Sequence, residues 1–489
     1  MNFGPLVAGV DSSTQSCKVE LRDAATGELV ATGSAPHPPA VPPRSEQRPD
    51  DWWSALVVAF RQAMEIADAS ADAVVAISVA AQCHGLVALD SADRVVRPAK
   101  LWNDTTSTPE LAALRSAIGD SRFVEEVGTL PTAAFTISKI AWLAAHEPAN
   151  FARVEHILLP HDYLTFRLTG ERVTDRSEAS GTGYFDAARN EYLTDMLAVI
   201  DTDRDWLPQL PTVIGPDEVA GEVTATALAE LGIRGRVRVG AGGGDQHAAA
   251  LGLGIGLGDV VYSFGTSGVV SALSRRPVRD VLGFVDGVAD MANGFMPLVS
   301  TLNAAKVTDA FARILGVDHA TLSRLAIEAP VDTVGPVLAA YLDGERTPDR
   351  PSATGILAGI TSESTREQVA RAAYEGVVLG LVSGQRHIER MGVATDGTII
   401  AVGGGARSQA YTQILADTLA RTVYTADVPQ ATARGAAVQA AAIASGRPVT
   451  DVRDEWVPQT KVVAEPRSAQ RDPWPSYTAV TSITTLDRA

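Results

Sequence analysis

The chain has 489 residues, of which 46% are apolar and 20% are charged, and it carries a formal net charge of −17 at pH 7. This balance is typical of a globular protein, and the length favours two sizeable domains over one. The negative charge makes nucleic acid and anionic membrane surfaces poor partners. Two cysteines are too few for a disulfide framework, and we find no signal-peptide pattern or long apolar span. We therefore expect a cytoplasmic protein.

The first apolar segments predict a β-hairpin whose turn reads DSSTQS. Backbone N–H groups and hydroxyls in such a turn can hold phosphate oxygens, and an acidic residue beside them can hold hydrated Mg²⁺. In this interpretation Asp11 is the carboxylate on the metal side, while Ser13, Thr14 and Gln15 lie against the phosphates. Asp, Ser and Thr are also common turn formers, so an ordinary turn is the more frequent outcome for this segment alone.

A predicted buried strand then leads into the segment AQCHG, and LWND follows after another short strand. His84 offers a donor and an acceptor to a sugar hydroxyl beside Cys83, although a single histidine is more often a packed residue. Trp102, Asn103 and Asp104 combine an aromatic face with amide and carboxylate groups. That composition suits a polyol, and a cluster that caps the edge of a sheet is about as frequent.

The segment GGGDQH follows a predicted strand at 237–241 and exposes Asp245 beside Gln246. A general base for a sugar hydroxyl needs a carboxylate in such a place. An aspartate after a strand also serves commonly as a helix N-cap, and the two roles are compatible.

The second half of the chain begins like the first. Predicted strands at 260–264 and 269–273 flank the tight turn GTSG, which holds Gly265, Thr266 and Ser267. Two such turns facing each other could hold the phosphates of a nucleotide between two domains. The repetition is a weak indication of an internal duplication.

A third glycine-rich turn, GGGARS, lies between a predicted strand at 399–402 and a helix. Gly404 and Gly405 let the backbone approach a flat ring or a ribose. The G-x-G-x-x-G spacing of dinucleotide-binding proteins is absent, so a simple strand-to-helix turn is about as frequent. Further on, residues 436–444 predict a helix of small residues suited to close packing.

Taken in order, these segments resemble the FGGY carbohydrate kinase family. The matching segments are VAGVDSSTQSCKVEL, EQRPDDWW, ISVAAQCHGLV, LWND, DYLTFRLTG, GGGDQHAAALG, SFGTSG, YLDGERTP and VGGGARSQAYTQILAD. The resemblance implies an α/β fold of two actin-like (ribonuclease-H-like) domains with the active-site cleft between them. We expect residues 1–248 to bind the sugar and form the first phosphate turn, and residues 249–489 to bind ATP.

The resemblance also implies an ATP-dependent kinase that converts D-xylulose to D-xylulose 5-phosphate, with ATP and Mg²⁺ bound and a homodimer as the expected assembly. Asp245 would be the catalytic base, and Asp11 would help to organise Mg²⁺. Both carboxylates would contact the cation through water. The sugar side would be formed by Cys83, His84, Trp102, Asn103, Asp104 and Gln246. The nucleotide side would be formed by Ser13, Thr14, Gln15, Gly265, Thr266, Ser267, Gly404, Gly405 and Ser408.

Three positions differ from the family's usual pattern. Cys83 stands where methionine is common, and we expect little effect from it. Gln246 stands where an asparagine usually follows the catalytic aspartate, and Thr106 lies in a segment where an arginine is frequent. A kinase for another pentulose such as ribulose, a pentitol or a related polyol is therefore an alternative. The sequence also leaves open whether Glu345 and Arg346 serve the site or brace the second domain.

Two further classes are an actin-like or chaperone-ATPase-like nucleotide switch, and a family member that binds sugar without turnover. Asp245 and the polar cluster on the sugar side argue against a switch. The presence of Asp11, Asp245 and both phosphate turns argues against a pure binder.

Overall fold

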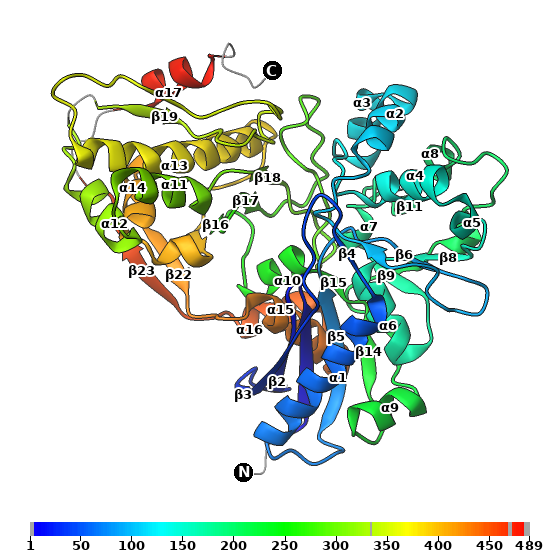
Figure 1. The fold of residues 1–489 in the computed structure, drawn as a ribbon. Helices are drawn as coiled ribbons and strands as arrows, with labels where there is room; N and C mark the ends of the chain where they lie inside the picture. Colours follow the sequence, from blue (N-terminus) through cyan, green and yellow to red (C-terminus); the bar gives the residue numbers. More distant parts are fainter. Residues whose placement is uncertain (1–3, 333–334, 468–471, 484–489) are drawn as a thin grey trace.

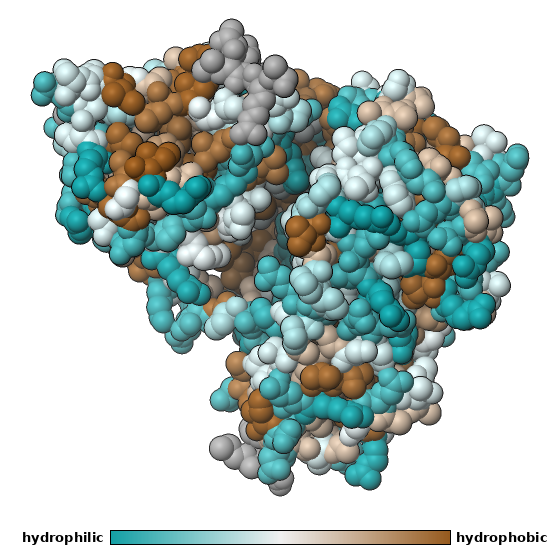
Figure 2. Space-filling view, in the orientation of Figure 1, coloured by the Kyte–Doolittle hydropathy of each residue, from teal (hydrophilic) through white to brown (hydrophobic). Residues whose placement is uncertain are grey.

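Two lobes, each built on a large mixed β-sheet, form the protein (Figure 1). The computed structural model describes residues 4–332, 335–467 and 472–483. In this described part of the chain, no helix combines the length and the apolar character needed to cross a bilayer. A cleft separates the lobes on one side of the molecule (Figure 2).

The first sheet has the strand order β13-β14-β5-β1-β2-β3, and the short strand β15 also pairs with β5. β1 is antiparallel to β2 and parallel to β5, which is in turn parallel to β14. Every residue of β1 is buried, as its apolar sequence predicts. The strands are β1 (Leu6–Ser12), β2 (Ser16–Asp23), β3 (Leu29–Pro36), β5 (Val74–Ala81), β13 (Val219–Glu222), β14 (Arg238–Gly240) and β15 (Gly243–Gly244).

The second sheet repeats this arrangement in the order β18-β17-β16-β21-β22-β23. β16 is antiparallel to β17 and parallel to β21, which is parallel to β22. The strands are β16 (Val260–Phe264), β17 (Gly268–Ala272), β18 (Leu298–Thr301), β21 (Ile399–Val402), β22 (Val423–Ala426) and β23 (Thr460–Ala464). The predicted hairpins at the start of each half are thus confirmed, and each opens a sheet of the same topology.

Helices cover both sheets. α1 packs on β2 and β3 of the first sheet, whereas α13 packs on β17 and β18 of the second. The helices around the first sheet are α1 (Pro49–Ile66), α6 (Pro160–Thr169) and α9 (Ala225–Leu231). Those of the second lobe are α11 (Ala305–Leu315), α12 (His319–Glu328), α13 (Arg366–Arg390), α14 (Gln409–Leu419) and α17 (Trp474–Thr481), with the strand pair β19 (Val337–Ala339) and β20 (Ile356–Ala358).

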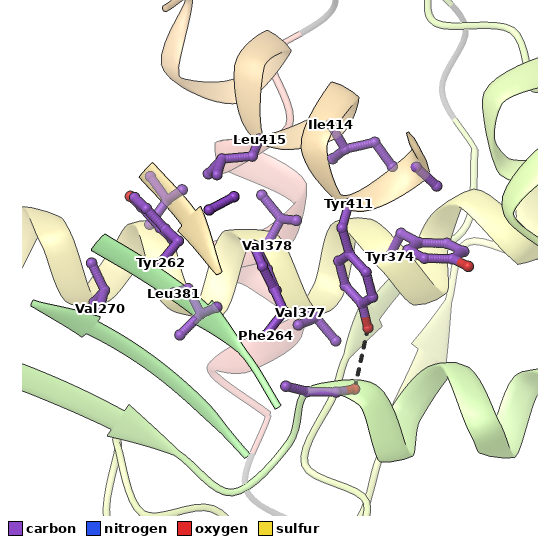
Figure 3. Packing of buried hydrophobic residues seen from close by; sticks show 14 of the residues in the cluster. Tyr262, Phe264, Val270, Tyr374, Val377, Val378, Leu381, Tyr411, Ile414 and Leu415 are labelled. Carbon is purple, nitrogen blue, oxygen red and sulfur yellow. Dashed lines mark hydrogen bonds between the residues drawn. The ribbon is translucent and has the colours of Figure 1, made fainter. Parts of the chain in front are cut away.

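Aromatic rings pack among aliphatic side chains in the core of the second lobe (Figure 3). The rings of Phe264 and Tyr411 stack with their centroids 4.8 Å apart, and Tyr374 meets Tyr411 edge-on at 4.6 Å. The Tyr411 hydroxyl donates a hydrogen bond to the carbonyl of Ala304 at 3.3 Å. Because Phe264 is the last residue of β16, this core supports the turn that follows the strand.

One helix of the second half crosses to the first sheet. α15 (Ala431–Ser445) packs on β1, β5 and α10 (Asp245–Gly252), followed by α16 (Val449–Glu455) (Figure 1). A Cβ at Gly9 would lie 1.9 Å from the carbonyl oxygen of Ala433, and a Cβ at Gly435 would lie 1.8 Å from that of Ala248. Only glycine permits such close approach. The helix that begins at Asp245 is therefore fixed against the strand that carries Asp11.

The predicted small-residue helix is confirmed by α15, which covers residues 436–444. The boundary that we expected after residue 248 falls inside α10. α10, which contains this point, packs on α15, and both helices contact the first sheet. The division into segments 1–248 and 249–489 stays a prediction.

A helical insertion between β5 and β13 forms the upper right part of Figure 1 and has its own apolar core around Phe123, Ile140 and Trp206. Its helices are α2 (Thr108–Ile118), α3 (Asp120–Arg122), η1 (Phe123–Val127), α4 (Thr136–His146), α5 (Pro148–Phe151), α7 (Arg176–Ala179), α8 (Thr194–Leu197) and η2 (Leu207–Gln209). Its strands are β6 (Val87–Leu89), β8 (His156–Leu158), β9 (Val173–Asp175), β10 (Phe185–Asp186), β11 (Glu191–Tyr192) and β12 (Thr212–Ile214); the pair β4 (Glu46–Gln47) and β7 (Ala99–Lys100) lies beside them.

Candidate active site

The predicted catalytic residues meet at one edge of the first sheet. β1, β5 and β15 are parallel, with Asp11 opposite Ala80 and Gly244 opposite Ala81. The residues that follow β5 and β15 therefore leave the sheet at the same edge as the end of β1. This brings Asp11, the Cys83–His84 segment and Asp245 together, although they are far apart in the sequence.

Asp245 is the first residue of α10 and is half-buried. The N-cap of this helix is Gly244, so the N-cap interpretation of Asp245 is wrong. Its Oδ1 accepts hydrogen bonds from the backbone N–H of Gln246 at 2.8 Å and from the Cys83 thiol at 3.4 Å. Burial and the negative charge of Glu178 raise the pKa of Asp245 to about 6. A carboxylate with this pKa is ionised at neutral pH and is suited to accept a proton.

Asp11 is buried, and its Oδ1 has no hydrogen-bond partner among the described residues. Burial and the negative charge of Asp245 raise the pKa of Asp11 to about 7, an effect that Lys18 partly offsets. The carboxylates of Asp11 and Asp245 repel each other, and Oδ1 of Asp11 is unpaired, so the pair fits a divalent cation. Within the described ranges, no group of three or more His, Cys, Asp or Glu residues surrounds a metal position. The arrangement thus fits Mg²⁺ whose other ligands are water and phosphate oxygens.

The first phosphate turn is braced by side chains. The Thr14 hydroxyl accepts a hydrogen bond from Trp102 Nε1 at 2.9 Å and donates one to Gln82 Oε1 at 3.2 Å. Gln47 Nε2 donates to the Thr14 carbonyl at 3.0 Å. The Ser13 hydroxyl donates to the Ser16 carbonyl at 3.2 Å, and the Gln15 side chain is exposed. Trp102, which we expected on the sugar side, thus also supports the phosphate turn.

The second phosphate turn joins β16 to β17 and is more open. Thr266 and Ser267 are exposed, and no hydrogen-bond partner is present for their hydroxyls in the described chain. The backbone N–H of Ala305 donates to the Gly265 carbonyl at 3.0 Å, and that of Ala304 donates to the Thr266 carbonyl at 3.2 Å. The start of α11 therefore holds the turn while its hydroxyls stay free.

The third glycine-rich turn lies between β21 and α14, where Gly404–Arg407 form the short helix η3. Gly404 is exposed and Gly405 is half-buried. The Ser408 hydroxyl donates to Ser323 Oγ at 3.0 Å. A ring or ribose could reach this backbone, because a Cβ at Gly404 would meet no other atom within 4 Å.

On the sugar side, His84 has a left-handed backbone with φ of 64°. Its ring stacks on Phe135 with the centroids 4.9 Å apart and the planes at 11°. Asn103 is half-buried and Gln246 is exposed. Cys83 is buried and reaches Asp245 through its thiol.

Asp104 lies where a sugar cannot reach it. The residue is fully buried, and its Oδ1 accepts hydrogen bonds from Lys100 Nζ at 3.0 Å and from the Thr106 hydroxyl at 2.6 Å. Its Oδ2 accepts a bond from the backbone N–H of Ser45 at 2.9 Å. Because both oxygens are occupied, Asp104 braces the loop that carries Trp102, and the expectation of direct sugar contact is not met. The Thr106 hydroxyl is also used inside this cluster.

Glu345 braces the second lobe. This buried carboxylate accepts hydrogen bonds from the backbone N–H of Leu302 at 2.6 Å and of Arg346 at 2.7 Å, and from Asn303 Nδ2 at 2.8 Å. It therefore holds the segment that precedes α11. Ala304 and Ala305, which follow this segment, bond to the second phosphate turn. Arg346 is half-buried beside it.

Sequence reasoning missed two buried groups behind the site. Glu178, on α7, contacts His84, and His161, on α6, lies 3.1 Å from Asp162 and 3.4 Å from Asp175. Neither stands in a glycine-rich turn, and only His161 adjoins a segment that resembles the family, DYLTFRLTG. For Glu178 the only available signal was an acidic residue three positions after another, which is common on protein surfaces.

The N-terminal domain of the FGGY family of carbohydrate kinases matches residues 6–252, and the C-terminal domain of that family matches residues 260–444. The chain belongs to the FGGY family of carbohydrate kinases. It is an ATP-dependent sugar kinase, and the predicted fold of two actin-like domains is confirmed.

Individual members of the family are similar over most of their length. The chain is 40% identical to a xylulose kinase of Streptomyces rubiginosus over 93% of this chain and 91% of that protein. It is 34% identical to a xylulose kinase of Escherichia coli over 84% of each chain. The crystal structure of a xylulose kinase from Bifidobacterium adolescentis superposes with a TM-score of 0.86 at 37% identity and covers 97% of this chain and 99% of that one.

Proposed function

We propose that this FGGY kinase transfers the γ-phosphate of ATP to O5 of D-xylulose, with Asp245 as the general base. The position of Asp245 carries the proposal. It begins α10 at the edge where β1 and β5 end, bonded to Cys83 and close enough to Asp11 for the two charges to repel. The similarity to xylulose kinases from Streptomyces and Escherichia coli supports D-xylulose as the acceptor.

In this mechanism Asp245 takes the proton of the acceptor hydroxyl as the phosphorus–oxygen bond forms. Its pKa of about 6 leaves it ionised at neutral pH, yet basic enough to share a proton in the transition state. His84, Asn103 and Gln246 orient the sugar by hydrogen bonds to its other hydroxyls. Because the bound hydroxyl is held next to the base, the entropic cost of bringing the two groups together is met on binding.

The nucleotide lies between the lobes in this proposal. Ser13, Thr14 and Gln15 bind the phosphates from one side, and Gly265, Thr266 and Ser267 bind them from the other. The turn with Gly404, Gly405 and Ser408 holds the adenosine. Asp11 and Asp245 would hold Mg²⁺ through water, and the cation would neutralise part of the phosphate charge.

A second candidate acceptor is another pentulose or a polyol. Gln246 favours it, because its exposed amide stands next to the base and is one methylene longer than the asparagine usual in the family. Asp104 and Thr106 are bonded to each other and to Lys100, so neither is free to compensate by binding a hydroxyl.

The substrate is tested by measuring ADP release with Mg²⁺ and ATP across D-xylulose, D-ribulose, L-ribulose, L-xylulose, glycerol and pentitols. We expect D-xylulose to give the highest kcat/KM, and its product to carry phosphate on O5. A higher kcat/KM for another sugar would assign the enzyme to that sugar. ADP release that no acceptor stimulates would contradict the proposal.

A further inference from the structure

A buried carboxylate stands between His84 and Asp245. The Glu178 side chain is fully buried, and its Oε1 accepts a hydrogen bond from the backbone N–H of His84 at 2.8 Å. The same oxygen lies 3.3 Å from Nδ1 of the His84 ring, a buried nitrogen that makes no hydrogen bond of good geometry in the described chain. Its Oε2 is buried and makes no hydrogen bond of good geometry in the described chain, with the Cys83 thiol as its polar neighbour. Burying an incompletely paired carboxylate is costly, so this one requires an explanation.

The short helix that carries Glu178 is tied to the segment of the base. Asp175 caps it, because its Oδ1 accepts from the backbone N–H of Glu178 at 3.0 Å and its Oδ2 from that of Ser177 at 2.8 Å. The Ser177 hydroxyl in turn accepts a bond from the backbone N–H of Gly244 at 3.5 Å. Gly244 directly precedes Asp245. The place of Glu178 relative to the base is thus set by hydrogen bonds on both sides.

The His84 ring is held in one orientation. The left-handed backbone at φ of 64° directs the side chain, Phe135 covers one face of the ring, and Gly181 lies against its edge. A Cβ at Gly181 would lie 2.2 Å from Cε1 and 2.4 Å from Nδ1 of His84. The side chain keeps 19% of its surface exposed. With Nδ1 facing Glu178, Nε2 lies on the other side of the ring.

We propose that Glu178 is a positioning residue for the sugar: it holds the His84 ring proton on Nδ1, so that Nε2 meets the sugar as a hydrogen-bond acceptor. This inference rests on the proposed function, because it assigns His84 to the sugar. A neutral imidazole that donates from one nitrogen accepts at the other. The position facing Nε2 therefore requires a hydroxyl, which can donate, and rejects a carbonyl oxygen, which cannot. His84 thereby contributes to the choice of sugar.

The test combines the Glu178→Gln variant with two measurements. In the first, ¹⁵N-histidine NMR of the wild-type protein without ligands, with the His84 signal assigned by its loss in His84→Gln, should show the proton on Nδ1. In the second, Glu178→Gln should raise the KM of the sugar that the wild type phosphorylates best by about 10- to 100-fold, the range expected for a charge-assisted hydrogen bond. The KM for ATP should change less than threefold.

The matched control is Glu110→Gln, which alters a second carboxylate–histidine pair, 2.7 Å from His146 on the helical insertion. We expect its kinetic constants to equal those of the wild type. Gly181→Ala offers an independent route, because it displaces the His84 ring and leaves Glu178 in place; it should raise the KM of the sugar to a similar extent. In the background of His84→Gln, Glu178→Gln should have little further effect on that KM.

A wild-type His84 protonated on Nε2, or a folded Glu178→Gln enzyme whose sugar KM stays within twofold, would overturn the inference. Should Glu178→Gln fail to fold, an unchanged sugar KM in Gly181→Ala would overturn it as well. Failure of the proposed function is a different result, since the wild type would then phosphorylate no sugar. The NMR measurement decides the protonation of His84 in that case too.

Discussion

The two phosphate turns occupy equivalent places in sheets of the same topology but differ in charge and support. In the first sheet, the pair Ser12–Cys17 closes a turn of four residues; in the second, the pair Phe264–Gly268 closes a turn of three. One position before the closing pair stands Asp11 in the first sheet and Ser263 in the second. The first turn is bonded to Trp102 and Gln82, whereas the hydroxyls of the second point into open space.

This difference shows how one scaffold, used twice, can divide the work of a kinase. At the edge of the first sheet stand the buried Asp11 and the half-buried Asp245, whose carboxylates suit the cation and the acceptor proton. The second ends in neutral N–H and hydroxyl groups, which suit the phosphates that a carboxylate would repel. The glycine contacts between β1, α15 and α10 then fix the acidic residues relative to one another.

The largest difference in catalytic rate is expected between variants at Asp11 on β1 and Ser263 on β16, which occupy equivalent positions. Asp11→Asn should lower kcat on the order of 10²- to 10³-fold and raise the Mg²⁺ concentration needed for half-maximal rate, because it removes the buried charge that faces the cation. Ser263→Ala should change kcat less than threefold. Steady-state kinetics at varied Mg²⁺ measure both, and similar losses in the two variants would remove the distinction between the turns.

Buried charge behind the first turn should also make stability depend on pH. Burial disfavours the charged form of His161, but the carboxylates of Asp162, Asp175 and Glu178 outweigh this and raise the pKa of His161 to about 9. A pKa above the ordinary 6.5 stabilises the folded protein below pH 6.5, and the gain is lost as the pH rises toward 9. Its size is at most about 3 kcal/mol.

The measurement is urea unfolding of the wild type and His161→Gln at pH 6.5 and pH 9. We expect the wild type to exceed the variant in free energy of unfolding by more at pH 6.5 than at pH 9. The control is His146→Gln, which alters a more exposed pair with Glu110 and should change stability by less than about 0.5 kcal/mol at both values. A His161 difference that is constant or grows with pH would show that the histidine is not held charged.

The smallest effects should distinguish the hydroxyls of the two turns. The Thr14 hydroxyl is already bonded to Trp102 and Gln82, so Thr14 would meet the phosphates through its backbone N–H. Thr14→Val should therefore lower the free energy of unfolding without ligand by about 1 kcal/mol and change the KM for ATP less than threefold. Thr266→Val should leave stability unchanged and raise the KM for ATP about fivefold, because its hydroxyl is free for the phosphates. Thermal unfolding and kinetics together check this pair, and the reverse pattern would exchange the roles of the turns.

The sequence predicted what depends on local pattern. Apolar runs gave the hairpins at 6–21 and 260–273 and the strand before Gly403, and small residues gave α15. The order of the motifs indicated the family and hence the two-lobed fold. These features could be predicted because turn residues and hydrophobic periodicity act over a few neighbouring positions.

The remaining features depend on contacts between distant segments. Asp104 looked like a sugar ligand until the structure showed Lys100 and Ser45 bonded to it. Glu178 carried no signal, because its role comes from His84, which is 94 residues earlier in the chain. The crossing of α15 to the first sheet follows from backbone contacts at Gly9 and Gly435, which no local pattern reveals.

The central claim is that Asp245 accepts the proton of the sugar hydroxyl, and Asp245→Asn tests it most directly. The amide keeps the shape of the side chain but cannot take a proton. The rate of phosphoryl transfer to D-xylulose in a single turnover should fall about 10²- to 10⁴-fold, while the dissociation constant for the sugar, measured by calorimetry, changes less than threefold. Asp203→Asn, an exposed aspartate on the helical insertion, should behave as the wild type. A folded Asp245→Asn enzyme that retains more than a tenth of the wild-type rate would contradict the account.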